Sequence, residues 1–224
     1  MNILKSLLLI ATTVMVTNSG ITTAAEPVQA SKRMLDYSYS GMDILFYGEI
    51  RNHAPEPRTQ QEFEALHAKA EKGDADSNYL LSDLYALETT LNAYYDPNIV
   101  SEEESERRIN QSLRFLQRAL DLNPRHPLAL NRAGINHEMG TPFPKDMSRA
   151  VYYYDLAARS GNGSAAHHLF EIYMAGRDGI SKDIAKARYY AEKAKDLGSN
   201  FHKYTTAHWD ETVEYYERFD KRGN

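Results

Sequence analysis

The chain has no cysteine among its 224 residues. That absence excludes disulfide bonds, thiolate zinc sites, a cysteine nucleophile and a lipid-modified cysteine behind a leader peptide. The length and the 42% hydrophobic content are those of one folded domain of ordinary size. Packing must therefore stabilise the fold, and the 16 tyrosines need a place in that packing.

Basic charge is also scarce. The chain carries 26 Lys and Arg against 31 Asp and Glu, a formal net charge of -5. Phosphate backbones are held by concentrated Lys and Arg, so we expect no nucleic-acid partner. Catalytic signatures are missing too, because the sequence contains no GxSxG, no phosphate-binding loop and no HExxH. These absences predict a binding protein without enzymatic activity, cofactor or metal.

Long apolar runs are confined to the N-terminus. Residues 1–30 follow the order of a secretory signal peptide, with Lys5, the apolar run Leu7–Val16 and then small residues. That run is about half of the roughly 20 residues that a membrane-spanning helix needs. Cleavage fits after Ala25 or after Ala30, and the second is slightly preferred. We therefore expect a mature protein in the periplasm or secreted beyond it, without stable membrane insertion.

The second half of the chain contains an internal repeat. Lys145 and Asp146 recur 37 positions later as Lys182 and Asp183. The same spacing relates Ala150 to Ala187, Tyr152 to Tyr189, Tyr153 to Tyr190, Ala157 to Ala194 and Gly161 to Gly198. At a spacing of 36, Ala129, Ala133, His137 and Gly140 match Ala165, Leu169, Tyr173 and Gly176. The extra residue therefore falls in the turn Gly176–Gly179, where a surface connection tolerates an insertion.

Each repeat reads as helix, turn, helix. Ala165, Leu169 and Tyr173 recur at every fourth residue, which places them along one stripe of a helix. Asp146 and Asp183 stand where each second helix should begin, because a carboxylate accepts hydrogen bonds from the free backbone N–H groups there. A glycine stands where each second helix should end. The pattern predicts an all-α fold.

This order of residues resembles the Sel-one-like repeat family, a relative of the tetratricopeptide repeats. The features that carry the resemblance are Gly140 or Gly176, then Lys-Asp, Ala, paired aromatics, Ala and a closing glycine, best matched over 127–200. Residues 119–134 are more similar to a tetratricopeptide junction. Both resemblances imply a solenoid of helix-turn-helix repeats, an α/α superhelix. Phe170 departs from the pattern, since a glycine is usual at that position.

The remaining segments complete the expected organisation. Thr59 with Glu62, and Ser101 with Glu104, match capping boxes that start helices. The expected segments are a signal peptide at 1–30, an N-terminal cap or linker at 31–58, a degenerate repeat with a long insertion at 59–126, Sel-one-like repeats at 127–163 and 164–200, and a C-terminal capping helix and tail at 201–224. Residues 43–50 fit either a short helix or a strand.

Two residue patterns have competing interpretations. His167 and Glu171 lie four positions apart on one helical face, but without a closely spaced third ligand they fit a solvated or partner-facing pair better than a metal site. The tyrosine runs at 152–154, 189–190 and 215–216 could be stacking platforms for bases or sugars. Their recurrence at the repeat period favours packing, because every repeat must bury the same interface.

The resemblance also implies a binding face. In tetratricopeptide-like repeats the first helix of each unit lines the concave side. Carried over to this sequence, the inward positions are Tyr79, Asp83, Asn131, Glu138, His167, Glu171 and Met174. This mostly polar set suits a protein or peptide segment better than a small apolar ligand.

The leading hypothesis is an exported protein-interaction scaffold or regulator, as the resemblance implies. A sharper alternative is an immunity-type protein that neutralises a toxic effector in the periplasm. A less favoured alternative is a cell-envelope hydrolase, since the sequence shows no catalytic motif.

Overall fold

The computed structural model describes residues 29–38, 53–87 and 101–220. The helices in these ranges are α1 (Lys32–Leu35), α3 (Gln60–Glu71), α4 (Ala75–Ala86), α5 (Glu102–Leu122), α6 (Pro127–Met139), α7 (Met147–Arg159), α8 (Gly163–Ala175), α9 (Ile184–Asp196), α10 (Asn200–Ala207) and α11 (Trp209–Asp220). No strand is formed in them, and the one β-bridge joins Arg177 to Ile180 in a turn. The prediction of an all-α repeat solenoid is confirmed.

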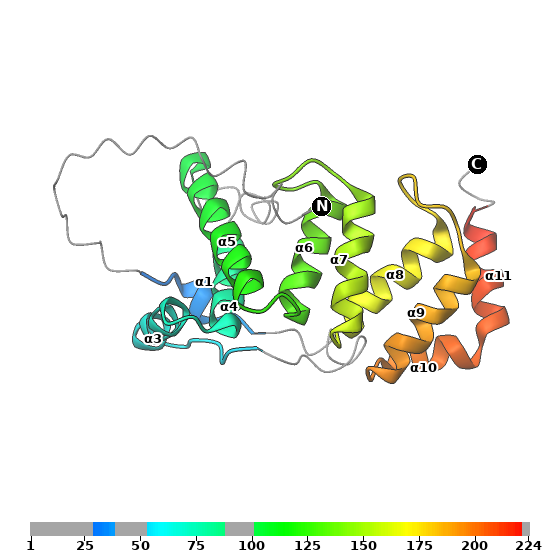
Figure 1. The fold of residues 1–224 in the computed structure, drawn as a ribbon, viewed down its shortest axis with the longest axis horizontal. Coiled ribbons are helices and arrows are strands. Elements are labelled where there is room, and N and C mark those ends of the chain that lie inside the picture. The colour runs from blue at the N-terminus through cyan, green and yellow to red at the C-terminus, as the bar shows by residue number, and fades with distance from the viewer. Residues whose placement is uncertain (1–28, 39–52, 88–100, 221–224) are drawn as a thin grey trace.

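The helices follow one another along the long axis of the molecule, from α3 at one end to α11 at the other (Figure 1). The most extensive contacts join α4 to α5, α6 to α7 and α8 to α9, so each pair is one structural repeat. The contact between α7 and α8 joins the last two repeats, and α10 packs on α9. The long insertion expected within residues 59–126 corresponds to residues 88–101, of which 88–100 lie outside the described residues. Residues 43–50 also lie outside them.

The predicted helix starts are largely confirmed. The side chains of Asp146 and Asp183 accept hydrogen bonds from backbone N–H groups of α7 and α9, with N···O distances of 2.9 and 3.0 Å. Thr59 and Glu62 form a full capping box at α3. Ser101 caps α5, but the Glu104 carboxylate binds Arg107 and Arg108 and does not complete the box. The bond to Arg107 is the main reason that the pKa of Glu104 falls to about 2.

The first helices of the repeats have their own caps, which the sequence comparison did not find. His126, Asn162 and Ser199 stand at spacings of 36 and 37, and each side chain accepts a hydrogen bond from the backbone N–H three residues on. All three are buried. Histidine, asparagine and serine share little beyond a hydrogen-bond acceptor atom. The three caps are therefore equivalent in the structure but could not be recognised as equivalent from the sequence.

The position of Phe170 is explained by an exchange of large and small residues between repeats. In the preceding repeat the equivalent residue is Gly134, where an added Cβ would lie 2.6 Å from the ring of Tyr154. One repeat later, Ala191 stands where Tyr154 does and Phe170 stands where Gly134 does. The large side chain has moved from the second helix to the first, and Phe170 is fully buried.

The C-terminal segment differs from the single capping helix that the sequence predicts. Helix α10 ends at Ala207, and α11 begins at Trp209 and packs back on α8. The break brings the rings of Trp209 and Tyr216 to 6.4 and 5.8 Å from the ring of Phe170, measured between centroids. These two aromatic residues close the end of the core that Phe170 would otherwise expose.

Tyrosine packing is only partly as predicted. Tyr154 and Tyr190 are buried. Tyr152, Tyr189 and Tyr215 expose 52%, 55% and 53% of their surface, so the prediction of packing is wrong for these three. The reason is helical geometry, since adjacent residues point about 100° apart and only one of each pair can face the neighbouring helix.

Candidate functional site

The predicted binding residues divide into buried and accessible ones. Tyr79, Asp83 and His167 expose 5%, 4% and 8% of their surface, and Met174 exposes none. Asn131, Glu138 and Glu171 are partly exposed. The assignment of Met174 to a binding face is therefore wrong, because its side chain is part of the core formed by α6 to α11.

Tyr79 and Asp83 belong to an internal network. The Asp83 carboxylate forms an ion pair with Arg132 of the next repeat and accepts hydrogen bonds from the hydroxyls of Tyr79 (2.8 Å) and Tyr37 (3.3 Å). The pKa of Arg132 is raised, mainly by the charge of Asp83. The pKa of Tyr37 is also raised, chiefly by burial and then by Asp83. These residues join α4 to α6 and to the segment after α1, and we assign them to the fold.

Glu138 and Glu171 come together through a residue that the sequence analysis did not select. Arg177 places Nη1 3.5 Å from Oε1 of Glu138 and Nη2 3.7 Å from Oε2 of Glu171. The two glutamates lie on the first helices of successive repeats, α6 and α8, and Arg177 lies in the turn after α8. We call Glu138, His167, His168, Glu171 and Arg177 the Glu138–Glu171 cluster.

The turn that carries Arg177 is the one-residue insertion predicted from the repeat comparison. Gly176 has φ +70°, and a Cβ there would lie 2.9 Å from the backbone nitrogen of Lys182, so the turn requires glycine. The backbone N–H of Asp183 donates to the Tyr173 carbonyl at 2.8 Å and closes the turn. The insertion was the signal that could have pointed to Arg177, because it is where the two repeats differ.

The carboxylate of Glu138 is also held in place by Tyr154. The Tyr154 hydroxyl donates to Oε2 of Glu138 at 2.6 Å, and its ring stacks on His168 with centroids 4.6 Å apart. Burial, followed by the bond to Glu138, raises the pKa of Tyr154. His168 Nδ1 lies 3.9 Å from the same carboxylate oxygen. The Glu138 carboxylate is therefore oriented before any partner arrives.

His167 connects Glu171 to the C-terminal helices. Its Nε2 lies 3.6 Å from Oε1 of Glu171, and its Nδ1 lies 3.0 Å from Nε2 of His202 on α10. Burial, and then the neighbouring His202, lower the pKa of His167 to about 3, and burial lowers that of His202 to about 4. Burial raises the pKa of Glu171, against the opposing charge of Arg177. The lowered pKa values of His167, His168 and His202 favour their uncharged forms at neutral pH.

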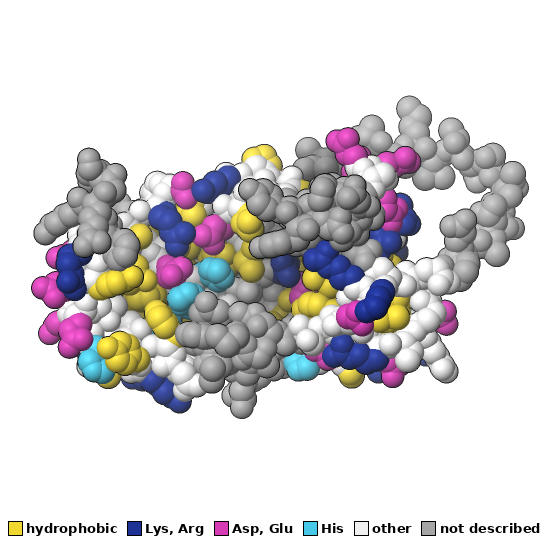
Figure 2. Space-filling view, turned by 180° about the vertical axis from the view of Figure 1, so that it is seen from behind, with side chains coloured by type: hydrophobic (Ala, Val, Ile, Leu, Met, Phe, Trp, Pro, Cys, Tyr) yellow, Lys and Arg dark blue, Asp and Glu magenta, His cyan; other side chains and the backbone are white. Residues whose placement is uncertain are grey.

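Acidic, basic and histidine side chains lie next to one another on the face shown in Figure 2, in the half of the molecule that carries α8. Within the described ranges, no group of three or more His, Asp or Glu side chains is placed to hold a metal ion. No helix in those ranges is both long and apolar enough to cross a membrane. In the Glu138–Glu171 cluster, the side chains of Glu171 and Arg177 are 38% and 40% exposed.

Comparison with known protein families finds repeats in the second half of the chain. The Sel1 repeat family model matches residues 127–162 and 163–199. Among solved structures, the chain is similar to a Sel1 repeat protein from Oxalobacter formigenes, with 24% identity and a TM-score of 0.49 over 66% of this chain and 99% of that one. No curated protein matches the sequence. Residues 127–199 therefore match two tandem Sel1 repeats.

Proposed function

We propose that this protein is an exported scaffold that binds a protein or peptide partner at the Glu138–Glu171 cluster. Sel1 repeats generally act as scaffolds for protein interactions. The observation that carries the proposal is that Arg177 holds carboxylates from two successive repeats on one face. A surface that spans two repeats in this way suits an extended segment of a protein better than a single small molecule.

The chemistry of the cluster supports a polar partner. Glu171 and Arg177 expose 38% and 40% of their side chains, so both can contact another chain. Glu138 exposes 17% and is already bonded to Tyr154, so it mainly orients Arg177. Groups held in place before binding lose little conformational entropy when a partner docks.

Charge reversal at Glu171 tests this surface. We expect Glu171→Lys to reduce retention of a partner from envelope extract about tenfold or more, because a charge-assisted hydrogen bond contributes about 1.5–3 kcal/mol. Quantitative mass spectrometry of proteins retained on the immobilised chain measures this. The matched control is Glu192→Lys on α9, whose side chain is 39% exposed and also pairs with a cation, Lys195.

A partner retained by the wild type and by Glu192→Lys, and lost with Glu171→Lys, supports the assignment. Equal retention by both variants would move the binding surface elsewhere. Circular dichroism spectra of both variants check that the helices remain folded.

The export part of the proposal rests on the leader, and the structure bears on where the leader would be removed. Ala30 packs against the hydrophobic core that includes Met34 of α1 and buried residues of α3 and α4, and its N–H donates to Oε1 of Gln60 at 2.9 Å. The next residue, Ser31, caps α1. Cleavage after Ala30 would remove these contacts and place a positive terminal amine at the start of α1, which the helix dipole disfavours.

We therefore expect the exported protein to begin at Glu26, the residue after Ala25. N-terminal sequencing or intact mass of the protein recovered from periplasm and medium measures this. A mature chain that begins at Ser31 contradicts the choice of site, and a chain that still begins at Met1 contradicts export itself.

A further inference from the structure

The far end of the solenoid has a second polar surface, separate from the Glu138–Glu171 cluster. A hollow of about 390 Å³ lies between the start of α9 and α11. It is lined by Ile184, Trp209, Asp210, Val213, Glu214 and Glu217. We call it the α11 hollow. Its walls combine apolar surface with carboxylates, so it resembles neither a core cavity nor a simple charged patch.

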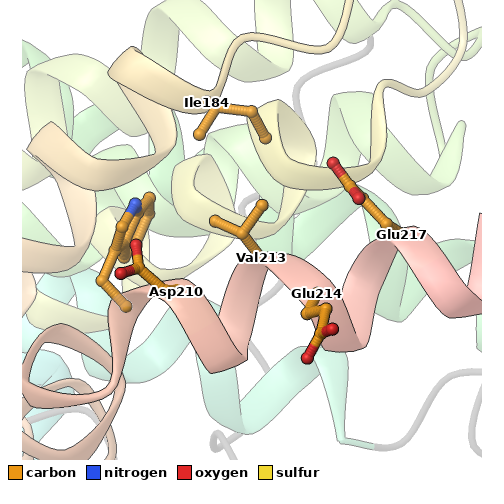
Figure 3. Close-up of a pocket in the computed structure, with 6 residues that line it drawn as sticks. Ile184, Asp210, Val213, Glu214 and Glu217 are labelled. Atoms are coloured by element: carbon orange, nitrogen blue, oxygen red, sulfur yellow. The ribbon is translucent and has the colours of Figure 1, made fainter.

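The spacing of residues on α11 produces this combination. Asp210, Val213, Glu214 and Glu217 lie at i, i+3, i+4 and i+7, which is one face of a helix. Figure 3 shows Ile184 and Val213 facing one another, with the carboxylates of Asp210 and Glu217 on either side, while the Glu214 carboxylate turns away. The apolar floor thus lies between two negative groups.

The two flanking carboxylates are available to a ligand. Within the described part of the chain, neither Asp210 nor Glu217 has a hydrogen-bonding or ion-pairing partner for its side chain. The third carboxylate, on Glu214, has Arg218 at 3.9 Å. Unpaired carboxylates beside an apolar surface favour a cation that brings apolar atoms with it.

Trp209 already makes a cation–π contact within the protein, which shows that its ring can pack against a basic side chain. The guanidinium of Arg188 lies over its ring, 5.5 Å from the centroid, although Arg188 does not line the hollow. The indole ring is therefore already used for a cation–π contact by the protein itself. A long basic side chain can lay its methylene groups on such a ring and keep its charge at the edge.

We propose that the α11 hollow binds a lysine or arginine side chain presented by an apolar segment of a partner protein. The aliphatic stem packs between Ile184, Val213 and Trp209. The charged group lies between the carboxylates of Asp210 and Glu217. The apolar neighbours of the basic residue cover the floor of the hollow and exclude water from the ion pairs, which strengthens them.

Trp209 is the only tryptophan of the chain and lines the hollow, so its fluorescence can be followed without interference from another tryptophan. The probe is an acetylated, amidated heptapeptide that alternates leucine and lysine. Two matched peptides carry glutamine or glutamate in place of lysine, and a third carries lysine without leucine. We expect the leucine-lysine peptide to change Trp209 emission in a saturable way, and its affinity to exceed that of each other peptide about tenfold.

Variants separate the hollow from general charge attraction. Asp210→Asn and Glu217→Gln should each weaken binding about tenfold, whereas Glu211→Gln, an exposed carboxylate of α11 outside the hollow, should not. Glu171→Lys should also leave this titration unchanged, so failure of the Glu138–Glu171 proposal and failure of this one can be told apart.

Equal binding of the glutamine peptide, or equal weakening by Glu211→Gln, overturns the proposal. The proposal is also overturned if Trp209 emission changes with protein concentration alone and sedimentation shows a dimer, because a second copy of the chain then occupies the hollow.

Discussion

Replacing Asp83 by alanine is expected to lower the free energy of unfolding by about 3 kcal/mol, near the lower end of the range for breaking a buried ion pair. The variant leaves Arg132 without its counter-charge and removes the acceptor for the hydroxyls of Tyr79 and Tyr37. Asp83 is 4% exposed, but Arg132 keeps 32% of its side chain in water, which limits the penalty. Urea unfolding followed by circular dichroism at pH 7.5 measures the change.

Two further variants show whether the loss comes from an isolated charge. Substituting Asp83→Leu and Arg132→Met together should restore the part of the stability that is lost to the isolated charge, since an apolar pair can replace a buried ion pair at little net cost. The hydroxyls of Tyr79 and Tyr37 still lose the Asp83 acceptor in this variant. Lys145→Ala breaks an exposed ion pair with Asp178, in which the side chains are 50% and 45% exposed, and should change stability by less than about 1 kcal/mol. A loss below about 1 kcal/mol in Asp83→Ala would show that water replaces the missing carboxylate.

The repeat period and the starts of the second helices were predictable because they depend on local chemistry. Asp146 and Asp183 cap helices in any tertiary context, and Gly140 and Gly176 adopt positive φ at the ends of α6 and α8. Spacing alone therefore placed the turns between helices correctly. The same reasoning found the full capping box of Thr59 and Glu62.

The accessible part of the face was harder to predict, because exposure depends on neighbours from other repeats. Asp83 and His167 occupy the inward positions that the resemblance implies, yet Arg132 and His202 from later helices cover them. Met174 is equivalent to Glu138 in the preceding repeat and is nevertheless fully buried. The burial of Met174 could not be predicted from the residue type at this position. It depends on α10 and α11, which pack against the last repeat and not against the preceding one.

Arg177 illustrates a second limit. It lies in an irregular turn, and its role depends on two carboxylates that are 33 residues apart in sequence. No period relates these three residues. Only the packing of α6 beside α8 brings them together.

Acidification is expected to destabilise the C-terminal half through the His167–His202 pair. In the folded chain the pKa values of these residues lie near 3 and 4, against about 6.5 in an unfolded chain. At pH values between the folded and unfolded pKa values, the unfolded state binds protons that the folded state does not. The free energy of unfolding is therefore highest above about pH 6.5 and falls as the pH drops towards 4. At pH 5 each histidine accounts for a loss of about 2 kcal/mol, at about 1.4 kcal/mol per pH unit.

The geometry explains why the folded state resists protonation. The two ring nitrogens are 3.0 Å apart, so only one hydrogen can lie between them, and two imidazolium rings would repel at that distance. Arg177 adds positive charge on the same side, while Glu171, at 3.6 Å from His167, opposes it. The raised pKa of Glu171 acts in the opposite direction to the histidines, because its extra stability is present at low pH and is lost as the pH rises.

Glutamine variants measure the contribution of the pair. Urea unfolding at pH 7.5, 6.5, 5.5 and 5.0 should show that His167→Gln with His202→Gln loses about 4 kcal/mol less between the extremes than the wild type does, because glutamine does not titrate. His208→Gln changes an exposed histidine at the junction of α10 and α11 and should keep the wild-type pH dependence. If the double variant follows the wild-type curve, the acid sensitivity comes from the other buried histidines, of which His126 and His137 also have lowered pKa values. If only the double variant differs from the wild type in the pH dependence of unfolding, the contact between α8 and α10 is the acid-sensitive part of the solenoid. This contact lies next to the face proposed to bind a partner.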